Sequence, residues 1–413
     1  MKMRDMVQRS GLSKDTLRYY MSLGLLMPRK GGAQFEFTDA DEEDIQEILH
    51  LKRMGFSLED IRGLLDERRI SNGIEPDYLD SMINRLHTQK KSLEARQKEI
   101  SEAIALVDDE IESCERKKGV FGESSGVPLC ALPLLACPHC GHGLQIENAA
   151  FSGKHLHSGN LRCACGYSAG IVDGVILTGN RYLDTDDRPD LTRGLYHGLC
   201  RQDFFRYYCD GATACMDALR EHGFEQRVVL ESNINGYFLL YQQLKLLPIS
   251  NLYIIADKYP EMVYLYKHLI ESINPALDIL YIADEKMEYP LQHGCVDIAI
   301  DFFGENEYLF YHNEPYIEKI SPYLASDAFG TGIFMAFAPG YPSRAAYKKK
   351  YPKLSPIQHD FPAIERAYRA AGFELDAREL GIITKTNNEY NFTCHRDGDP
   401  MKLWFFCGER KGE

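Results

Sequence analysis

A regular series of apolar positions between residues 79 and 111 constrains the fold of this chain most. The steps between these positions alternate between four and three residues over more than four repeats, which is a heptad pattern. The pattern predicts one helix over residues 76–116, whose 79–111 part would be roughly 50 Å long at about 1.5 Å per residue. The positions of the series, of which only a lysine and a glutamine are not apolar, are Leu79, Ile83, Leu86, Lys90, Leu93, Gln97, Ile100, Ile104, Val107 and Ile111.

Such a narrow stripe can be buried against the chain's own domain or against a second copy of the same helix. A helix lying on its own domain would need a wider apolar face than strict a and d positions provide. We therefore favour a coiled coil in which residues 79–111 of two chains form a homodimer.

The segment before the long helix has the pattern of a helix-turn-helix. A polar turn at residues 10–11 precedes a short predicted helix, Gly24 can end that helix, and Pro28 prevents another one soon after. The second helix of such a motif enters the major groove of DNA. The whole chain has a net charge of −14, but residues 2–30 hold seven Lys or Arg against two Asp or Glu, and residues 36–47 hold seven acids and no base. This distribution favours oriented contact with DNA over nonspecific coating.

Three segments of this region resemble the start of MerR-family transcription regulators, namely Thr16–Tyr20, Gly24–Pro28 and Leu51–Ile61. The resemblance implies a winged helix-turn-helix over residues 1–72 and promoter DNA as its partner. It also implies that a small-molecule effector changes how the dimer distorts the promoter, so that RNA polymerase is affected indirectly, through the DNA.

The family pattern places nine residues of this chain at the expected DNA interface. Lys14 and Asp15 would reach base edges from the recognition helix, while Arg18 and Tyr19 would contact phosphates. The wing lacks the arginine that relatives usually have there, so we expect it to contribute less affinity. The implied set is Ser13, Lys14, Asp15, Thr16, Arg18, Tyr19, Lys30, Phe37 and Arg53.

A linker is predicted over residues 117–135, where Gly122–Gly126 and Pro128 interrupt any regular pattern. Metal-sensing relatives of the MerR family carry cysteines just past the dimer helix. Here Cys114 and Cys130 lie sixteen residues apart with no compact loop between them. We therefore do not expect metal sensing.

Two close pairs of cysteines within residues 136–178 predict a zinc ribbon. The pairs lie about twenty residues apart, and four thiolates can close a tetrahedral zinc shell, although the second pair has one intervening residue where two are usual. Such a shell leaves no open position, so we expect structural Zn²⁺ rather than catalytic zinc; the alternative is a small β-rich linker with four reduced cysteines. The predicted ligands are Cys137, Cys140, Cys163 and Cys165, and the possible substitutes are Cys130, His139, His142, His155 and His157.

Residues 180–413 alternate predicted strands and helices, which indicates a parallel sheet with helical crossovers. The predicted strands are Val228–Glu231, Leu252–Asp257, Leu277–Asp284, Val296–Phe302 and a last, aromatic strand Lys402–Cys407, with a helix over Glu261–Ile270. The predicted fold class is thus multidomain, α plus α/β: a winged helix-turn-helix, a dimerising coiled coil, a small zinc ribbon and a Rossmann-like domain.

This last region resembles class I S-adenosylmethionine-dependent methyltransferases. The similarity lies in Asp257–Met262, in Ala283-Asp284 and in the strand that begins at Val296. It implies a methyltransferase-type fold in which the carboxylate of Asp257 accepts hydrogen bonds from ribose hydroxyls. The implied cofactor residues are Glu231, Asn233, Asn235, Gly236, Asp257, Lys258, Ala283 and Asp284.

The turn after the first strand departs from the methyltransferase pattern. Asn233 and Asn235 stand where glycines usually let the backbone approach the cofactor, although asparagine tolerates a left-handed conformation. Tyr237 follows where a small residue is usual, and residues 301–304 lack the Asn/Asp-Pro-Pro-aromatic tetrad of amino methylation. We therefore expect the fold to be kept and cofactor binding to be altered.

These features together predict a dimeric, DNA-binding transcription regulator that senses a small molecule through a degenerate methyltransferase-like domain. S-adenosylmethionine is one candidate for that small molecule. The alternative is an active methyltransferase with an autoregulatory DNA-binding domain, and the altered turn makes us favour the role without catalysis. No stretch of about 18 apolar residues is present, and Met1–Asp5 does not lead into a signal peptide, so we expect a cytoplasmic protein with no membrane partner.

Overall fold

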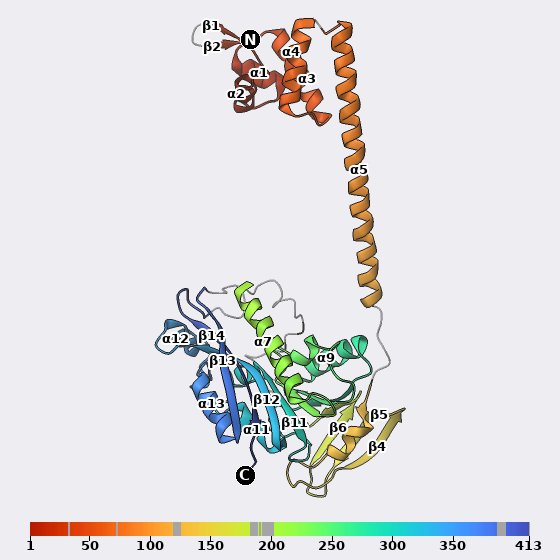
Figure 1. The fold of residues 1–413 in the computed structure, drawn as a ribbon, viewed down its shortest axis with the longest axis vertical. Helices are drawn as coiled ribbons and strands as arrows, with labels where there is room; N and C mark the ends of the chain where they lie inside the picture. The colour runs from red at the N-terminus through yellow and green to blue at the C-terminus, as the bar shows by residue number, and fades with distance from the viewer. Residues whose placement is uncertain are drawn as a thin grey trace. The chain divides into compact units, whose positions relative to one another are not determined.

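The computed structural model describes residues 1–31, 34–71, 73–118, 125–181, 189, 191, 202–385 and 394–412. These residues fall into two compact units, Met1–Gly119 and Val120–Glu413, which we call the N-terminal unit and the C-terminal unit (Figure 1). No helix in the described ranges is both long and apolar enough to cross a membrane.

The described part of the N-terminal unit consists of helices and one short hairpin. Their bounds are α1 (Met3–Ser10), α2 (Lys14–Ser22), β1 (Arg29–Gly31), β2 (Gln34–Glu36), α3 (Asp39–Arg53), α4 (Leu58–Ser71) and α5 (Pro76–Lys118). Ser13 caps the start of α2 by accepting a hydrogen bond from the backbone N–H of Thr16. Gly24 follows the end of α2 at a φ of 73°, in the left-handed region that favours glycine. The predicted helix-turn-helix is confirmed, with β1 and β2 as its wing.

The core of the N-terminal unit explains which face of α2 is exposed. Leu17 and Tyr20 of α2 are buried together with Ile45 and Ile48 of α3 and Ile61 of α4. These apolar side chains recur at helical spacing, so each helix turns one stripe inward. The charged side of α2 is thereby left on the surface.

The long helix α5 spans 43 residues and contains the whole predicted stretch 76–116. Near its start, Met82 and Leu86 pack against the core of the N-terminal unit. Further along, the heptad positions lie on the surface, and Ile100 and Ile104 are 54% and 56% exposed. The helix is confirmed, while its pairing with a second copy remains a prediction.

The C-terminal unit is built on a twelve-stranded sheet with the strand order β13-β14-β12-β11-β8-β9-β10-β7-β6-β5-β3, in which β4 pairs with β5. The strands are β3 (Val127–Pro128), β4 (Gln145–Ser152), β5 (His155–Arg162), β6 (Ser168–Val172), β7 (Val175–Leu177), β8 (Val228–Ser232), β9 (Leu252–Asp257), β10 (Asp278–Ala283), β11 (Val296–Phe302), β12 (Leu324–Phe337), β13 (Phe373–Ile383) and β14 (Met401–Arg410). The helices are η1 (Leu129–Leu134), α7 (Gln202–His222), α8 (Leu239–Gln242), α9 (Pro260–Ile273), α10 (Gly304–Tyr308), α11 (Tyr316–Ile320), η2 (Ser321–Tyr323), α12 (Pro342–Lys350) and α13 (Phe361–Ala370).

The centre of this sheet has the doubly wound order of a Rossmann-like fold. The parallel strands β8 to β12 lie in the order β10-β9-β8-β11-β12, which is the 3-2-1-4-5 order, and antiparallel β14 lies between β12 and β13. Helices α7 and α9 cover one face, and α11 and α13 cover the other (Figure 1). All six residues of β9 are buried, as a strand covered on both faces requires. The predicted α/β fold with a parallel sheet is confirmed.

The cysteine-bearing segment is hydrogen-bonded into the same sheet. Strands β5, β6 and β7 form an antiparallel meander, and β7 pairs in parallel with β10, so that Val175 lies opposite Tyr281. The regions predicted as separate domains, residues 136–178 and 180–413, therefore share one continuous sheet.

Candidate functional site

The exposed face of α2 carries the predicted base and phosphate contacts. The side chains of Lys14, Arg18 and Tyr19 all lie on the surface. The Arg18 guanidinium is 3.9 Å from the carboxylate of Asp15, and such a surface pair is weak enough to open when a phosphate approaches. This face can therefore supply both hydrogen-bond donors and positive charge to DNA.

Some of the remaining predicted interface residues are exposed, and others stabilise the domain itself. Lys30 in β1 and Arg53 at the end of α3 are exposed. The Ser13 hydroxyl caps α2 by accepting a hydrogen bond from the Thr16 N–H at 3.0 Å, and it lies 2.8 Å from the Thr16 hydroxyl, so both side chains are engaged within the protein. Phe37 is only 2% exposed and belongs to the core. The buried ring anchors the wing to the helices, and a contact between Phe37 and DNA remains a prediction.

The four predicted zinc ligands come together in the C-terminal unit. The sulfur atoms of Cys137, Cys140, Cys163 and Cys165 all lie within 4.8 Å of one another. The Cys137 and Cys165 sulfurs are 3.4 Å apart, as are those of Cys140 and Cys163. Within the described ranges no other His, Cys, Asp or Glu side chains form such a group. The histidines and Cys130, considered as substitutes, are thus outside this cluster.

Tight turns present the thiols to the centre of the cluster. The N–H of Gly141 donates to the carbonyl of Cys137 at 2.8 Å, and the N–H of Gly166 donates to the carbonyl of Cys163 at 3.0 Å. Both glycines have a positive φ, 75° and 100°, which other residues adopt only with strain. The backbone N–H of Tyr167, followed by the side chains of Cys137 and Cys163, lowers the pKa of Cys165 to about 6, whereas burial raises the pKa of Cys137.

Three predicted cofactor carboxylates are buried at the carboxyl ends of adjacent parallel strands. Glu231 is the second-last residue of β8, Asp257 ends β9, and Asp284 directly follows β10. Each is at most 2% exposed. Ligands of doubly wound sheets bind at this edge, where the strand order reverses. The structure therefore places these three residues where the resemblance implies a cofactor.

The loop after β8 folds onto Asp257. One carboxylate oxygen of Asp257 accepts a hydrogen bond from the N–H of Tyr259 at 2.9 Å, and the other accepts one from the N–H of Asn235 at 3.0 Å. Asn233 has a φ of 57°, in the left-handed region that asparagine tolerates better than most residues. Gly236 is half-buried beside it. The asparagine-bearing turn is thus kept, but its own backbone binds the carboxylate predicted to hold a ribose.

Glu307 of α10 contacts this site from a segment that no sequence pattern singled out. One Glu307 oxygen accepts a hydrogen bond from the side-chain amide of Asn235 at 3.2 Å and lies 3.4 Å from the ammonium of Lys258. The same ammonium lies 4.4 Å from the ring centre of Tyr311, a cation–π distance. Glu307 follows Lys258 by 49 residues, so no local spacing pattern connects them.

Glu231 serves the fold of the loop. Its two oxygens accept hydrogen bonds from the N–H groups of Leu239 at 2.7 Å and Leu240 at 2.9 Å. These bonds satisfy the first donors of α8, which have no partner within that helix. Burial raises the pKa of Glu231 to about 8. Both oxygens are therefore used by the chain itself.

Asp284 accepts hydrogen bonds from residues that follow β7, at the end of the cysteine-bearing segment. The Thr178 hydroxyl donates to one Asp284 oxygen, the Asn180 amide donates to the same oxygen at 2.9 Å, and the Glu288 N–H donates to the other oxygen at 3.1 Å. Ala283, just before it, is buried. Thr178 and Asn180 follow β7, a polar turn after a strand that sequence reasoning did not connect with this site.

The stability of the C-terminal unit should depend on pH through Asp257. Burial raises the pKa of Asp257 from 3.8 to about 7, so the folded state favours the protonated carboxyl. The stability that Asp257 contributes is fully present below the pKa of this residue in the unfolded chain. As pH rises from there toward 7, the free energy of unfolding falls by at most about 1.4 kcal/mol per pH unit. We expect urea unfolding at pH 5, 6 and 7 to show a smaller decline for Asp257→Asn than for the wild type. Equal declines would contradict this assignment.

Comparison with known proteins identifies the N-terminal residues. Residues 1–68 match the model of the MerR HTH family regulatory proteins. The HTH-type transcriptional regulator YfmP of Bacillus subtilis is 28% identical over 132 residues, which cover 30% of this chain and 92% of YfmP. The HTH-type transcriptional activator TipA of Streptomyces coelicolor is 28% identical over 120 residues, which cover 28% of this chain and 45% of TipA. Residues 1–68 are therefore a MerR-type helix-turn-helix domain.

Two solved structures illustrate the two parts of the chain. A MerR-family regulator from Bacillus cereus is 22% identical, with 29% of this chain and 86% of that chain covered and a TM-score of 0.24. Geranyl diphosphate C-methyltransferase from Streptomyces coelicolor is 10% identical, with 56% and 87% covered and a TM-score of 0.36. The strand order of its own sheet gives the C-terminal unit a Rossmann-like fold.

Proposed function

We propose that this chain is a homodimeric, DNA-binding transcription regulator whose C-terminal unit binds a small-molecule effector. The observation that carries the proposal is the basic, exposed face of α2 in a MerR-type domain. In this arrangement α2 enters the major groove, Lys14 and Asp15 meet base edges, and Arg18 and Tyr19 meet phosphates. Lys30 of the wing and Arg53 of α3 add contacts to the backbone.

Replacing Arg18 by alanine should weaken DNA binding and reduce its salt dependence. Each phosphate contact that is lost lowers the slope of log K against log salt by about one. The measurement is fluorescence anisotropy at several salt concentrations, on the duplex that the wild type selects from a randomised pool. Lys91 is an exposed cation on α5, and Lys91→Ala is the matched control. It should leave both the affinity for DNA and the salt slope unchanged. An unchanged slope for Arg18→Ala would remove the phosphate role from this residue.

Dimerisation through residues 79–111 would present two copies of α2 to a two-fold symmetric site. In this proposal the long helix over residues 76–116 joins the DNA-binding domain of residues 1–72 to a linker over 117–135. An effector bound to residues 180–413 would favour one dimer geometry on the promoter and thereby influence RNA polymerase through the DNA.

The cysteine cluster supports a structural Zn²⁺ within residues 136–178. The donor set fits zinc, because four sulfurs gathered within 4.8 Å can each contribute one ligand to a tetrahedral shell. Zinc would connect the turn before β4 with the turn between β5 and β6. It would thereby fix the meander that continues into the sheet through β7.

The buried polar edge after β8, β9 and β10 is the proposed effector site. The residues that would surround a ligand are Asn233, Asn235, Gly236, Asp257, Lys258, Ala283 and Asp284, with Glu231 supporting the loop. A ligand with ribose hydroxyls would compete with the Asn235 N–H for Asp257, since both are hydrogen-bond donors. S-adenosylmethionine meets that description.

Active methyl transfer is a second candidate function, favoured by the buried carboxylates of Asp257 and Asp284 at the ends of the adjacent strands β9 and β10. Calorimetric titration of S-adenosylmethionine into the full-length, zinc-loaded protein separates the possibilities, with Asp257→Asn as the variant that should bind more weakly. Micromolar binding without transfer of a labelled methyl group supports the sensor, and transfer to a small molecule or RNA supports the enzyme. Absence of binding at millimolar concentration points to a different effector.

A further inference from the structure

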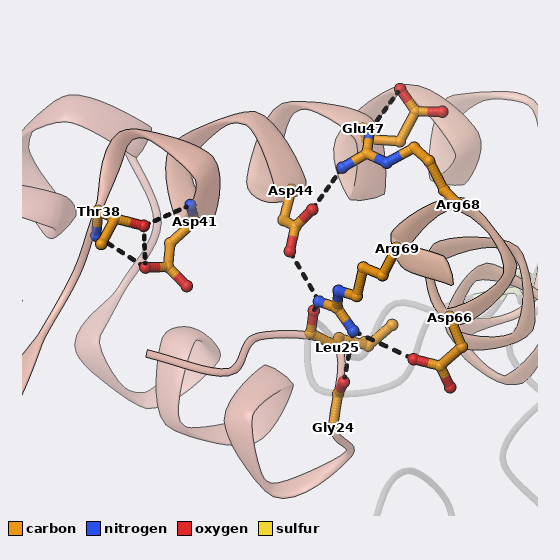
Figure 2. Close-up of polar contacts among 9 residues, drawn as sticks. All are labelled: Gly24, Leu25, Thr38, Asp41, Asp44, Glu47, Asp66, Arg68 and Arg69. Carbon is orange, nitrogen blue, oxygen red and sulfur yellow. Dashed lines mark hydrogen bonds and ion pairs between the residues drawn. The ribbon is translucent and has the colours of Figure 1, made fainter. Parts of the chain in front are cut away.

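A partly buried ion cluster joins α3 to α4 beneath the DNA-binding surface. The carboxylate of Asp44 in α3 accepts hydrogen bonds from both Arg68 and Arg69 of α4, the latter at 2.7 Å (Figure 2). Only 12% of the Asp44 side chain is exposed, against 28% for Arg68 and 25% for Arg69. Partly buried charges lose hydration, so they are stable only where well-placed partners replace the lost water contacts.

Arg69 also reaches the end of α2, which Arg68 does not. Its Nη2 donates to the carbonyl of Leu25 at 2.7 Å, and its Nη1 lies 3.5 Å from the carbonyl of Gly24 (Figure 2). The same Nη1 donates to Asp66 at 3.1 Å. Gly24 and Leu25 belong to the turn that follows α2, which ends at Ser22, so Arg69 binds the backbone of that turn. The turn that ends α2 is thereby tied to α4 through one side chain.

We propose that Arg69 is a positioning residue for DNA recognition, which holds α2 at a fixed angle to α3 and α4. This inference rests on the proposed function, because it assumes that α2 reads DNA. A planar guanidinium suits the task, since its fixed fork can serve a carboxylate and two carbonyls at once, whereas the ammonium of lysine is a point charge. Arg69 would act on α2 through the backbone of the turn that follows it, since its hydrogen bonds there go to the carbonyls of Leu25 and Gly24.

The other side of α4 is tied to the long helix α5. Glu67 of α4 accepts hydrogen bonds from Arg85 at 2.7 Å and from the hydroxyl of Ser81 at 3.0 Å, both on α5. The amide of Gln89 on α5 donates at 2.9 Å to the carbonyl of Met54, between α3 and α4. Helix α4 thus links the proposed dimer helix to the end of α2. A shift of α5 within the dimer would change the angle at which α2 meets the groove.

The matched pair Arg69→Met and Arg68→Met tests the proposal. Each variant removes one of the two arginines on Asp44, but only Arg69→Met also removes the contacts with Leu25 and Gly24. On the duplex selected by the wild type, we expect Arg69→Met to bind about tenfold more weakly or worse, and Arg68→Met to stay within about threefold of the wild type. The salt slope should be unchanged in both, since no phosphate contact is lost.

The two variants also distinguish this inference from the proposed function. Equal affinities of Arg69→Met and Arg68→Met would overturn the positioning role. A salt slope that falls by about two, one for each chain of the dimer, would assign Arg69 to a phosphate instead. If the wild type selects no DNA, the proposed function fails, and the positioning role falls with it.

Hydrogen exchange gives a readout that does not depend on DNA. The backbone amides of Gly24 and Leu25 donate to the carbonyls of Met21 and Tyr20, respectively. They should exchange faster in Arg69→Met than in Arg68→Met. Uniformly faster exchange throughout α1 to α4 would indicate a loss of stability alone and would also contradict the proposal.

Discussion

Replacing Cys163 by serine is expected to abolish the binding of one zinc ion per chain and to destabilise the C-terminal unit strongly. Structural zinc contributes about 10–16 kcal/mol in zinc-finger peptides, which is as large as the whole stability of a typical domain. In this chain the cluster lies beside a meander that continues into the central sheet through the pairing of β7 with β10. Loss of the metal should therefore lower the thermal midpoint of the entire unit. Elemental analysis and thermal unfolding measure the two effects.

Cys209→Ser is the control for this experiment. Cys209 is an exposed thiol on α7 and does not belong to the cluster. Its replacement therefore removes one sulfur that is not a predicted zinc ligand. We expect the zinc content and thermal midpoint of this variant to equal those of the wild type. Unchanged zinc content in Cys163→Ser, or a wild-type protein without zinc after growth in zinc-supplemented medium, would contradict the structural metal.

Features set by local spacing could be predicted from the sequence. The heptad series gave the long helix, because its period alone fixes which side chains share a face. The buried strands and their polar ends gave the doubly wound sheet and the positions of Asp257 and Asp284. Asn233 has the left-handed conformation that asparagine tolerates, at a position where the family pattern has glycine.

Contacts between distant segments could not be predicted from such patterns. Glu307 meets Asn235 across 72 residues, and the pairing of β7 with β10 makes the cysteine-bearing segment part of the central sheet. Phe37 matched a family position but is buried, because the motif marks residue identity and not the direction of the side chain. The bond from Arg69 to Leu25 depends on how α4 crosses the end of α2, which only tertiary packing determines.

Replacing Ile104 by aspartate should convert the protein to a monomer and reduce its affinity for a two-fold symmetric DNA site by about 10²–10⁴. The 56% exposed Ile104 lies at a heptad position of α5, where a carboxylate would be buried against the partner helix without a counter-charge. Two linked DNA-binding domains gain affinity because the second one binds intramolecularly, and a monomer loses this gain. Analytical ultracentrifugation gives the mass, and fluorescence anisotropy gives the affinity.

Leu106→Asp separates dimerisation from a general effect of added charge. Leu106 is 71% exposed on the same helix but lies outside the heptad series, so its replacement introduces the same charge away from the seam. We expect this variant to remain a dimer with wild-type affinity. For Ile104→Asp, the slope of log K against log salt should also fall to about half, because one DNA-binding domain contacts about half as many phosphates as two. A monomer that keeps the full slope would mean that DNA restores the dimer, and equal effects of the two variants would place the interface elsewhere on α5.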